Sequence, residues 1–238
     1  ASDVYKRQAY EGTICADNTM ENYVRRLYYY TADTRDPARS EVDFWVQALA
    51  EGDVTPAVLG QSFIFTTDKA NSYTDAQAFY TMASYALLGT DVTTGNADAY
   101  LPYFAEGGAM QAYKQLFNLT SCVESFAALG VDVGTMDDRI PLDRTVLAQE
   151  VEAARATRST QSTADEADKA TYLTARSQME RNKRLLEKQA ISRQDYEMAD
   201  AAYVRAKSAY ENSQTTLADT RLRAPFAGAV EKKYVDNY

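Results

Sequence analysis

The sequence feature that most constrains the fold is a long stretch with neither glycine nor proline, residues 142–224. Glycine and proline are the residues that most often interrupt regular backbone structure, so their absence over this length predicts long helices. The preceding part of the chain is different, because nine of the ten glycines lie at or before Gly134. A chain of 238 residues is long enough for two domains, and we expect two parts of different architecture to meet near residue 134.

Charge is distributed in the same way. Residues 1–133 contain 8 Lys and Arg against 17 Asp and Glu, whereas residues 134–238 contain 17 of each class. An acidic first part argues against a nucleic-acid surface there, and balanced charges in the second part are typical of a solvated, salt-bridged surface. The composition therefore predicts that nucleic acid is not a partner.

The residue types available for chemistry are few. The chain has no histidine, which excludes the usual catalytic triads and zinc sites. No spaced acidic pair and no nucleophile with a partner can be singled out. The two cysteines, Cys15 and Cys122, could form a disulfide in an oxidising compartment or remain free and buried, and we favour free thiols. We therefore expect a protein that is not an enzyme, with no catalytic residue, no metal site and no cofactor.

The first part contains an internal repeat. Leu49 aligns with Phe104, and Gly52 with Gly107, at a spacing of 55 residues. Each copy combines amphipathic helical patterns with loops rich in Asp, Thr and Gly. The prediction is a helical two-repeat domain over residues 9–133.

Aromatic side chains mark the expected core of this domain. Tyr23, Leu27 and Tyr30 recur at the spacing of one helix face, and such a stripe is buried far more often than it binds a ligand. A loop with two aspartates, residues 91–98, does not have the spacing of an EF-hand. We expect a solvated loop there rather than a calcium site.

Over residues 20–125 the repeat resembles a family of uncharacterised bacterial domains found in secreted and surface proteins. The resemblance is carried by the aromatic helices and by Phe44-Trp45, which fits the family's YW-type helix, whereas Ala99-Tyr100 lacks the Trp. What it implies is an extracytoplasmic module with no assigned chemistry.

The second part carries the heptad pattern of a coiled coil. Seam residues alternate at intervals of three and four along two segments. In the first segment they are Tyr172, Ala175, Met179, Asn182 and Leu186, and in the second they are Tyr196, Ala199, Tyr203, Ala206, Tyr210, Ser213 and Leu217. These segments predict the two arms of an antiparallel coiled-coil α-hairpin over residues 134–218.

Helix-capping signals predict the connection between the arms. Ser192 can accept from the backbone N–H of Asp195 while the Asp195 carboxylate accepts from the Ser192 amide, which is a capping box, and Ile191 can pack on Tyr196 as a hydrophobic staple. A new helix is therefore expected after Ser192, with the hairpin tip near residues 189–191. One unbroken helix is the alternative, because no glycine or proline interrupts the run. The cap, the staple and the restarted heptads together favour the hairpin.

From about residue 136 to residue 238 the sequence resembles the HlyD-like periplasmic adaptor subunits, or membrane fusion proteins, of bacterial tripartite efflux pumps and secretion systems. The segment RLLEKQAISRQDYE resembles the family's hairpin tip, and LADTRLRAPFAGAVEKKYVDNY resembles its return into the lipoyl-like, or barrel-sandwich, domain. The expected fold class is mainly α. It comprises an N-terminal helical repeat domain, a long antiparallel coiled-coil hairpin and a partial lipoyl-like β segment over residues 219–238.

The resemblance also assigns partner-binding residues. Adaptors of resistance-nodulation-division pumps carry the tip motif R-x3-L-x6-S, which this sequence matches at Arg181, Leu185 and Ser192. By resemblance, these residues would dock on the helical barrel of a TolC-like outer-membrane channel. Taken without the family, Arg181 could be a solvated charge, Leu185 a seam residue and Ser192 only a helix cap.

The resemblance implies that this chain is a fragment of a periplasmic adaptor subunit. Such a subunit is associated with the inner membrane and bridges an inner-membrane transporter to a TolC-like channel, as a homo-oligomer. The alternative is a secreted or surface-attached binding module built on the N-terminal aromatic repeat, with the coiled coil as its stalk. Calcium or glycan binding by residues 9–133 would favour this alternative.

The chain also departs from the family. The helical repeat stands where the first lipoyl-like strands would be, no apolar run is long enough to span a membrane, and no signal peptide is visible. We therefore expect anchor and signal to be absent from this chain. Residues 2–8 resemble translated sequencing adapter, and residues 1–8 are taken as a non-native leader. Whether the two parts form one natural protein or an artificial join of two reading frames stays open.

Overall fold

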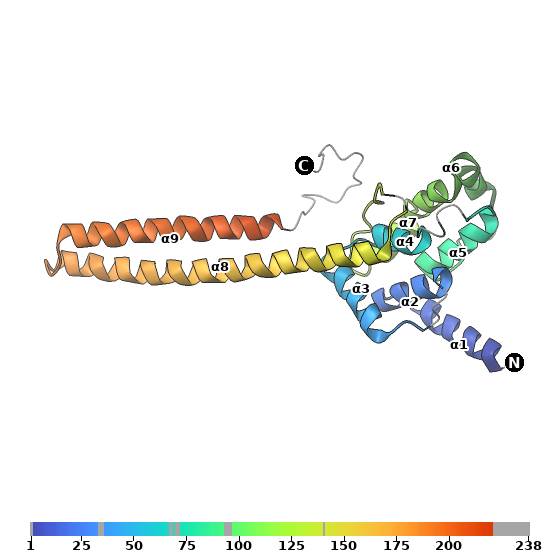
Figure 1. The fold of residues 1–238 in the computed structure, drawn as a ribbon, viewed down its shortest axis with the longest axis horizontal. Coiled ribbons are helices and arrows are strands. Elements are labelled where there is room, and N and C mark those ends of the chain that lie inside the picture. Colours follow the sequence, from blue (N-terminus) through green and yellow to red (C-terminus); the bar gives the residue numbers. More distant parts are fainter. Residues whose placement is uncertain are drawn as a thin grey trace. The chain divides into compact units, whose positions relative to one another are not determined.

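The computed structural model describes residues 2–32, 36–66, 69, 72–92, 97–139 and 141–220, with the backbone alone for residues 2–7 and 97–98. The chain forms two compact units, Ala1–Val151 and Glu152–Tyr238. The described ranges contain nine helices and no strand (Figure 1). The helices are α1 (Ser2–Ala16), α2 (Met20–Thr31), α3 (Arg39–Glu51), α4 (Pro56–Ile64), α5 (Ala76–Leu88), α6 (Ala97–Phe117), α7 (Thr120–Ala127), α8 (Arg144–Glu187) and α9 (Arg193–Asp219).

The two copies of the repeat fold into helices in the same order. The first copy consists of α2, α3 and α4, and the second consists of α5 and the two halves of α6. Non-helical backbone at Gly107 and Gly108 divides α6, and it corresponds to the left-handed Gly52 that ends α3 with φ 74°. In the second copy the positive φ, 66°, falls at Gly108 rather than at Gly107. The helix α7 follows the second copy and has no counterpart in the first.

The core of the first unit is aromatic. Of the stripe predicted on α2, Tyr23 and Leu27 are fully buried, whereas Tyr30 is only half-buried. Tyr28, which lies off the stripe, is buried and packs edge-to-face on Phe63 of α4 with ring centroids 4.7 Å apart. Rings and aliphatic side chains from both copies join one buried cluster, which gives this unit a single core.

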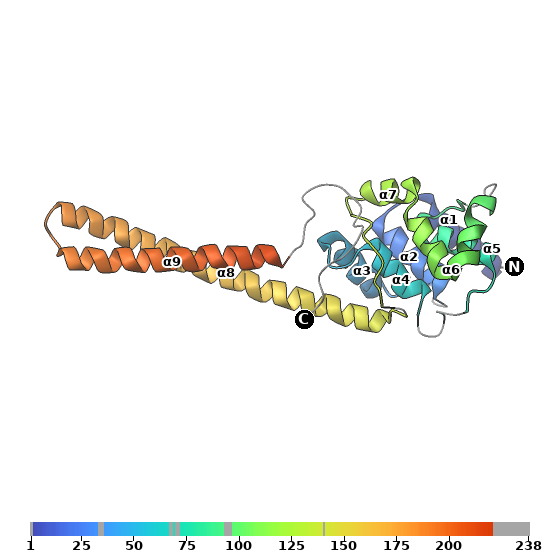
Figure 2. The same ribbon diagram turned by 90° about the horizontal axis from the view of Figure 1, so that it is seen from above.

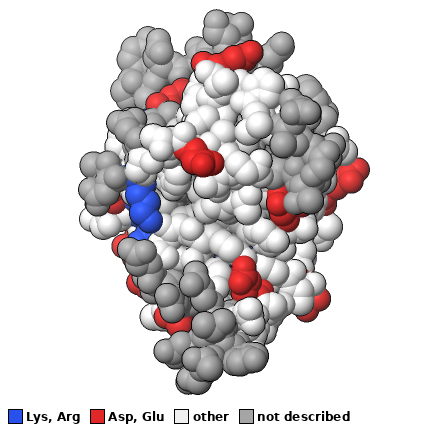
Figure 3. Space-filling model, turned by 90° about the vertical axis from the view of Figure 1, so that its right-hand side faces the viewer, with Lys and Arg blue, Asp and Glu red and all other residues white. Residues whose placement is uncertain are grey.

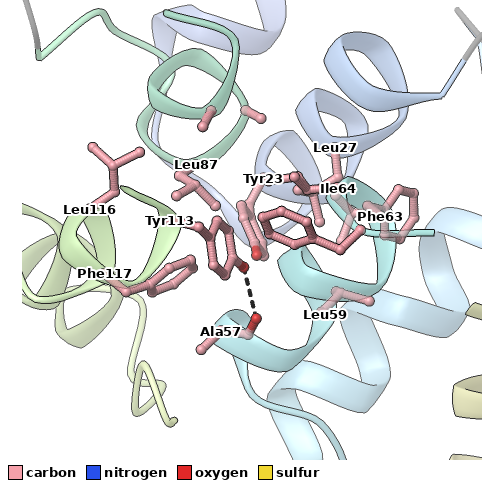
Figure 4. Packing of buried hydrophobic residues seen from close by; sticks show 14 of the residues in the cluster. Tyr23, Leu27, Ala57, Leu59, Phe63, Ile64, Leu87, Tyr113, Leu116 and Phe117 are labelled. Carbon is pink, nitrogen blue, oxygen red and sulfur yellow. Dashed lines mark hydrogen bonds between the residues drawn. The ribbon is translucent and has the colours of Figure 1, made fainter. Parts of the chain in front are cut away.

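Two buried tyrosines meet at the first turn of α4 (Figure 4). The hydroxyl of Tyr23 donates to the Pro56 carbonyl at 2.7 Å, and that of Tyr113 on α6 donates to the Ala57 carbonyl at 2.8 Å. Burial raises the pKa of both hydroxyl groups well above its ordinary value, so they remain neutral donors. Gly60 makes room for them, because a Cβ there would lie 2.5 Å from the Tyr113 hydroxyl oxygen and 3.0 Å from that of Tyr23.

The segment that follows α7 is fixed to α4 by hydrogen bonds. The side chain of Gln61 is fully buried, and its Nε2 donates to the Asp137 carbonyl at 2.8 Å while its Oε1 accepts from the Asp137 N–H at 2.8 Å. The N–H of Ala57, in the first turn of α4, donates to the Val133 carbonyl at 3.0 Å. A primary amide offers one donor and one acceptor in the manner of a peptide group, so Gln61 pairs with both backbone groups of Asp137.

The first two turns of α8 belong to the same core. Leu147 and Val151 are buried in its cluster. The guanidinium of Arg144 lies 4.5 Å from the ring centroid of Phe63, within the range of a cation–π contact. The boundary between the compact units therefore lies inside α8, whereas the composition changes near residue 134.

The second unit is an antiparallel pair of helices. The chain turns between the end of α8 at Glu187 and the start of α9 at Arg193, at the position that the capping signals predict. The two helices lie side by side in Figure 1, and in Figure 2 they are seen to cross at an angle. One unbroken helix is thereby excluded, and the mainly α fold is confirmed.

The prediction of a partial lipoyl-like β segment over residues 219–238 is wrong where the structure describes that segment. No strand occurs in the described ranges, and the first residue of that segment, Asp219, is the last residue of α9, with Thr220 as its C-cap. The seam residue Leu217 carries the heptad pattern to the edge of the segment without a breaker, so helix extends into it. Residues 221–238 lie outside the described residues.

Replacing Gly60 by alanine should destabilise the first unit by about 1–3 kcal/mol. The added methyl group would push the Tyr113 hydroxyl away from the Ala57 carbonyl. Gly12→Ala is the matched control, because a Cβ there meets nothing within 4 Å and alanine favours the helix by up to about 1 kcal/mol. Urea unfolding followed by circular dichroism measures both changes. Equal stability of Gly60→Ala and the wild type would contradict this packing.

The thiol of Cys122 should resist alkylation until the first unit unfolds. Both cysteines are free, and Cys122 is the buried one. Burial raises the pKa of its thiol to about 12, so at about pH 8 almost none of the reactive thiolate is present. In a Cys15→Ser chain, labelling by iodoacetamide across a urea series should follow the unfolding curve. Fast labelling without urea would instead show that the core opens locally at this helix.

Candidate docking site at the hairpin tip

Tyrosine rings hold the two arms of the hairpin together. Tyr172 of α8 stacks on Tyr210 of α9 with centroids 5.6 Å and planes 17° apart, and its centroid lies 5.8 Å from that of Tyr203. Further from the tip, the hydroxyl of Ser213 donates to Asp165 across the arms at 3.3 Å. Residues of the predicted heptad seam therefore face the opposite arm, which fixes the register of the turn.

The helix α8 ends in a Schellman motif. Gln189 has φ 55° and is the only non-glycine residue with a positive φ among those that the structure describes. Its N–H donates to the Leu186 carbonyl at 2.8 Å, and the N–H of Ala190 donates to the Leu185 carbonyl at 2.8 Å. These bonds satisfy carbonyl groups that the helix end would otherwise leave open. A residue with a Cβ is strained here by roughly 1–2 kcal/mol, so the tip stores local backbone strain.

The helix α9 begins with the predicted capping box, which is confirmed. The N–H of Asp195 donates to the Ser192 hydroxyl oxygen at 3.1 Å, and the N–H of Ser192 donates to Asp195 Oδ2 at 3.3 Å. The Ser192 hydroxyl itself donates to the same carboxylate oxygen at 2.7 Å. The Asp195 charge also lies in the first turn of the helix, where the helix dipole favours it.

The structure places the three motif residues on both sides of the turn. Arg181 and Leu185 lie one turn apart on α8, so they share one face of that helix. Arg181 is exposed, with its guanidinium on the Gln178 side-chain oxygen, and Leu185 is half-buried. Ser192 lies across the turn as the N-cap of α9. The fold therefore brings Arg181 and Leu185 together and gives Ser192 a capping role.

The last turns of α8 carry exposed positive charge. The basic side chains there are those of Arg181, Lys183 and Arg184, and Lys188 follows directly after the helix. Within the described part of the chain no ion pair joins any of them to an acidic group, whereas Arg176 and Arg193 nearby each pair with a glutamate at 2.9 Å. Cations near the carboxyl end of a helix are stabilised by its dipole, by about 0.3–1 kcal/mol each. The same charges are available to a partner that presents carboxylate or carbonyl oxygens.

The sequence reveals the basic cluster of the tip but not the left-handed conformation of Gln189. No local signal indicates the left-handed conformation of Gln189, because glycine or asparagine usually marks such a position and residues 188–191 contain neither. The basic cluster is visible in the segment RNKRLLEK, although only its first arginine belongs to the family motif.

Comparisons of this chain with protein-family models, curated proteins and solved structures give no match. Among the described residues, no group of three or more potential ligand side chains could hold a metal ion. None of the described helices combines the length and the apolarity that crossing a membrane requires.

Replacing Gln189 by glycine should stabilise the hairpin by about 0.5–1 kcal/mol. Glycine removes the strain of the left-handed conformation, and the greater freedom of the unfolded chain offsets part of the gain. Gln214→Gly is the matched control, because the same exchange at an exposed position inside α9 should cost at least about 0.5–1 kcal/mol. Hydrogen exchange of α8 and α9 amides in the full chain gives both values. Changes of the same sign would contradict the Schellman motif.

Proposed function

We propose that this chain acts as the docking arm of a periplasmic adaptor, a non-enzymatic subunit that links an inner-membrane transporter to a TolC-like outer-membrane channel. The proposal is carried by one observation. The R-x3-L-x6-S motif falls at the turn of an antiparallel helical hairpin, with Arg181 and Leu185 in the last two turns of α8 and Ser192 capping α9. The hairpin and its motif together suit a periplasmic homo-oligomer of the kind that the resemblance implies.

The tip offers groups that a helical barrel can bind. Helices associate by inserting side chains into the grooves between turns of their neighbours. Leu185 is only half-buried, so it can contribute its remaining apolar surface to such a groove. Arg181 presents a planar guanidinium that suits carboxylate groups or the carbonyl groups at helix ends. An apolar contact beside a cation is a combination that gives both affinity and orientation.

The length of the hairpin supports a role in reaching a distant partner. The helix α9 has 27 residues, which corresponds to about 40 Å at 1.5 Å per residue. The ring of Tyr172 packs against those of Tyr203 and Tyr210 on the opposite arm, which holds the arms together at this level of the hairpin. A partner bound at the tip is therefore held far from the opposite end of the hairpin, which suits a connecting subunit.

The proposal predicts that the full chain crosslinks to a purified TolC-like channel through the tip. Leu185→Ser and Arg181→Asp should each lower the crosslinked yield by at least about fivefold, as expected when a side chain at the centre of an interface is lost. Arg205→Asp is the matched control, because it makes the same charge change at an exposed position of α9 away from the tip. Loss of crosslinking in this control as well would indicate general charge attraction only.

A further variant separates docking from capping at Ser192. Asparagine caps helices about as well as serine, so Ser192→Asn should keep the helix content seen by circular dichroism. Its larger side chain should still weaken crosslinking if Ser192 touches the channel. If the wild type crosslinks no better than Leu185→Ser and Arg181→Asp, the tip is only a helix end, and the proposal fails.

A further inference from the structure

The first unit contains a groove of about 570 Å3 lined by residues of α1, α2 and α5 and by Asp75, the N-cap of α5. Aromatic, apolar and acidic side chains line it. The lining residues used in the binding argument below are Tyr30, Tyr85, Ala78, Met82, Glu11 and Asp75. None of the described residues that line the groove is basic. The groove belongs to the first unit alone, so a ligand bound there would act independently of the hairpin tip.

Two stacked tyrosines form one wall of the groove. The rings of Tyr30 and Tyr85 have centroids 5.5 Å and planes 23° apart. Tyr29 packs edge-on against Tyr30 at 4.9 Å, which fixes the position of that ring. Both rings of the pair are half-buried, so part of each stays accessible. The part of each ring that stays accessible is a π surface of the kind that attracts planar cations.

Glu11 provides a carboxylate at the groove, and its partner among the described side chains is a tyrosine. Its Oε1 accepts a 2.7 Å hydrogen bond from the Tyr30 hydroxyl, and no ion pair in the described part of the chain neutralises it. Burial and this bond to Glu11 raise the pKa of Tyr30, so the hydroxyl stays protonated and holds the carboxylate in place. Asp75 differs, because it caps α5 by accepting from the Ala78 N–H at 2.8 Å.

Cations of the neighbouring helix are engaged elsewhere. Arg25 pairs with Glu21 at 2.9 Å. Arg26 is buried, and its guanidinium donates to the carbonyls of Ile14 at 3.0 Å and Leu87 at 3.2 Å. The face of this unit in Figure 3 shows scattered acidic patches and little basic surface. The described charges at the groove are therefore those of Glu11 and Asp75, which favour a positively charged ligand.

We propose that this groove binds the guanidinium group of an arginine side chain presented by another polypeptide. A guanidinium can stack on the tyrosine pair while its N–H groups donate to Glu11, and its methylene stem can lie along Met82 and Ala78. An open groove suits a side chain on a larger molecule, because small-molecule sites usually enclose most of their ligand. This site does not depend on the docking function of the tip.

The test is a titration of the full chain with the peptide acetyl-Gly-Gly-Arg-Gly-Gly-amide. Calorimetry and the NMR signals of the tyrosine rings report binding. The matched probe carries citrulline in place of arginine, which keeps the shape and removes the charge. The arginine peptide should bind with a dissociation constant in the millimolar range, and the citrulline peptide should bind at least about fivefold more weakly, since cation–π and charge-assisted contacts are lost.

Two variants of equal charge change decide where the peptide binds. Glu11→Gln should weaken arginine-peptide binding by about fivefold or more, because the charge-assisted hydrogen bonds are lost. Glu124→Gln, at an exposed position of α7, should leave it unchanged. Equal binding of both peptides, equal loss in both variants, or no binding at millimolar concentration would overturn the inference. Arg181→Asp at the tip should not alter peptide binding, so failure of this site and failure of the docking function can be told apart.

Discussion

The first unit depends on the hydrogen bonds that converge on α4. Its carbonyls at Pro56 and Ala57 accept from tyrosines of the two repeat copies, and its Gln61 pairs with the backbone of Asp137. These bonds join residues that are 33, 56 and 76 positions apart in the chain. A buried polar group that loses its partner costs about 1–3 kcal/mol. One arrangement of the two copies and of the following segment satisfies all of these groups, so α4 specifies the fold as well as stabilising it.

Local signals in the sequence predict the hairpin well and the repeat core less well. The capping box involves only Ser192 and Asp195, which lie within four consecutive residues. The heptad spacing places Tyr172 and Tyr210 on the faces where the two arms meet, and their rings stack there. The core is different, because α2 packs against α1, α3, α4 and α5 and therefore has no single buried face. Tyr28 is buried for this reason, while Tyr30, which fits the one-sided stripe, lies at the edge and is free to line a groove.

Composition and packing divide the chain at different places. Gly134 marks the change in composition, and it lies against Thr55 with φ 73°, where a side chain would meet that residue. The chain nevertheless continues to pack on the same core through Leu147 and Val151. Side chains from both sides of Gly134 complete one core, which favours a single polypeptide across that point.

The tip of the hairpin combines features that a turn optimised only for stability would lack. Gln189 is strained where glycine would be relaxed, Leu185 leaves apolar surface uncovered, and the basic side chains of the last turns have no ion-pair partners in the described part of the chain. Substitutions that relieve such features are readily available to a protein, and violations of local rules concentrate at functional sites. A partner with apolar grooves and acceptor oxygens would offset the exposed apolar surface and the unpaired charge together. A solvated stalk would offset neither, so these features fit a docking arm better than a stalk.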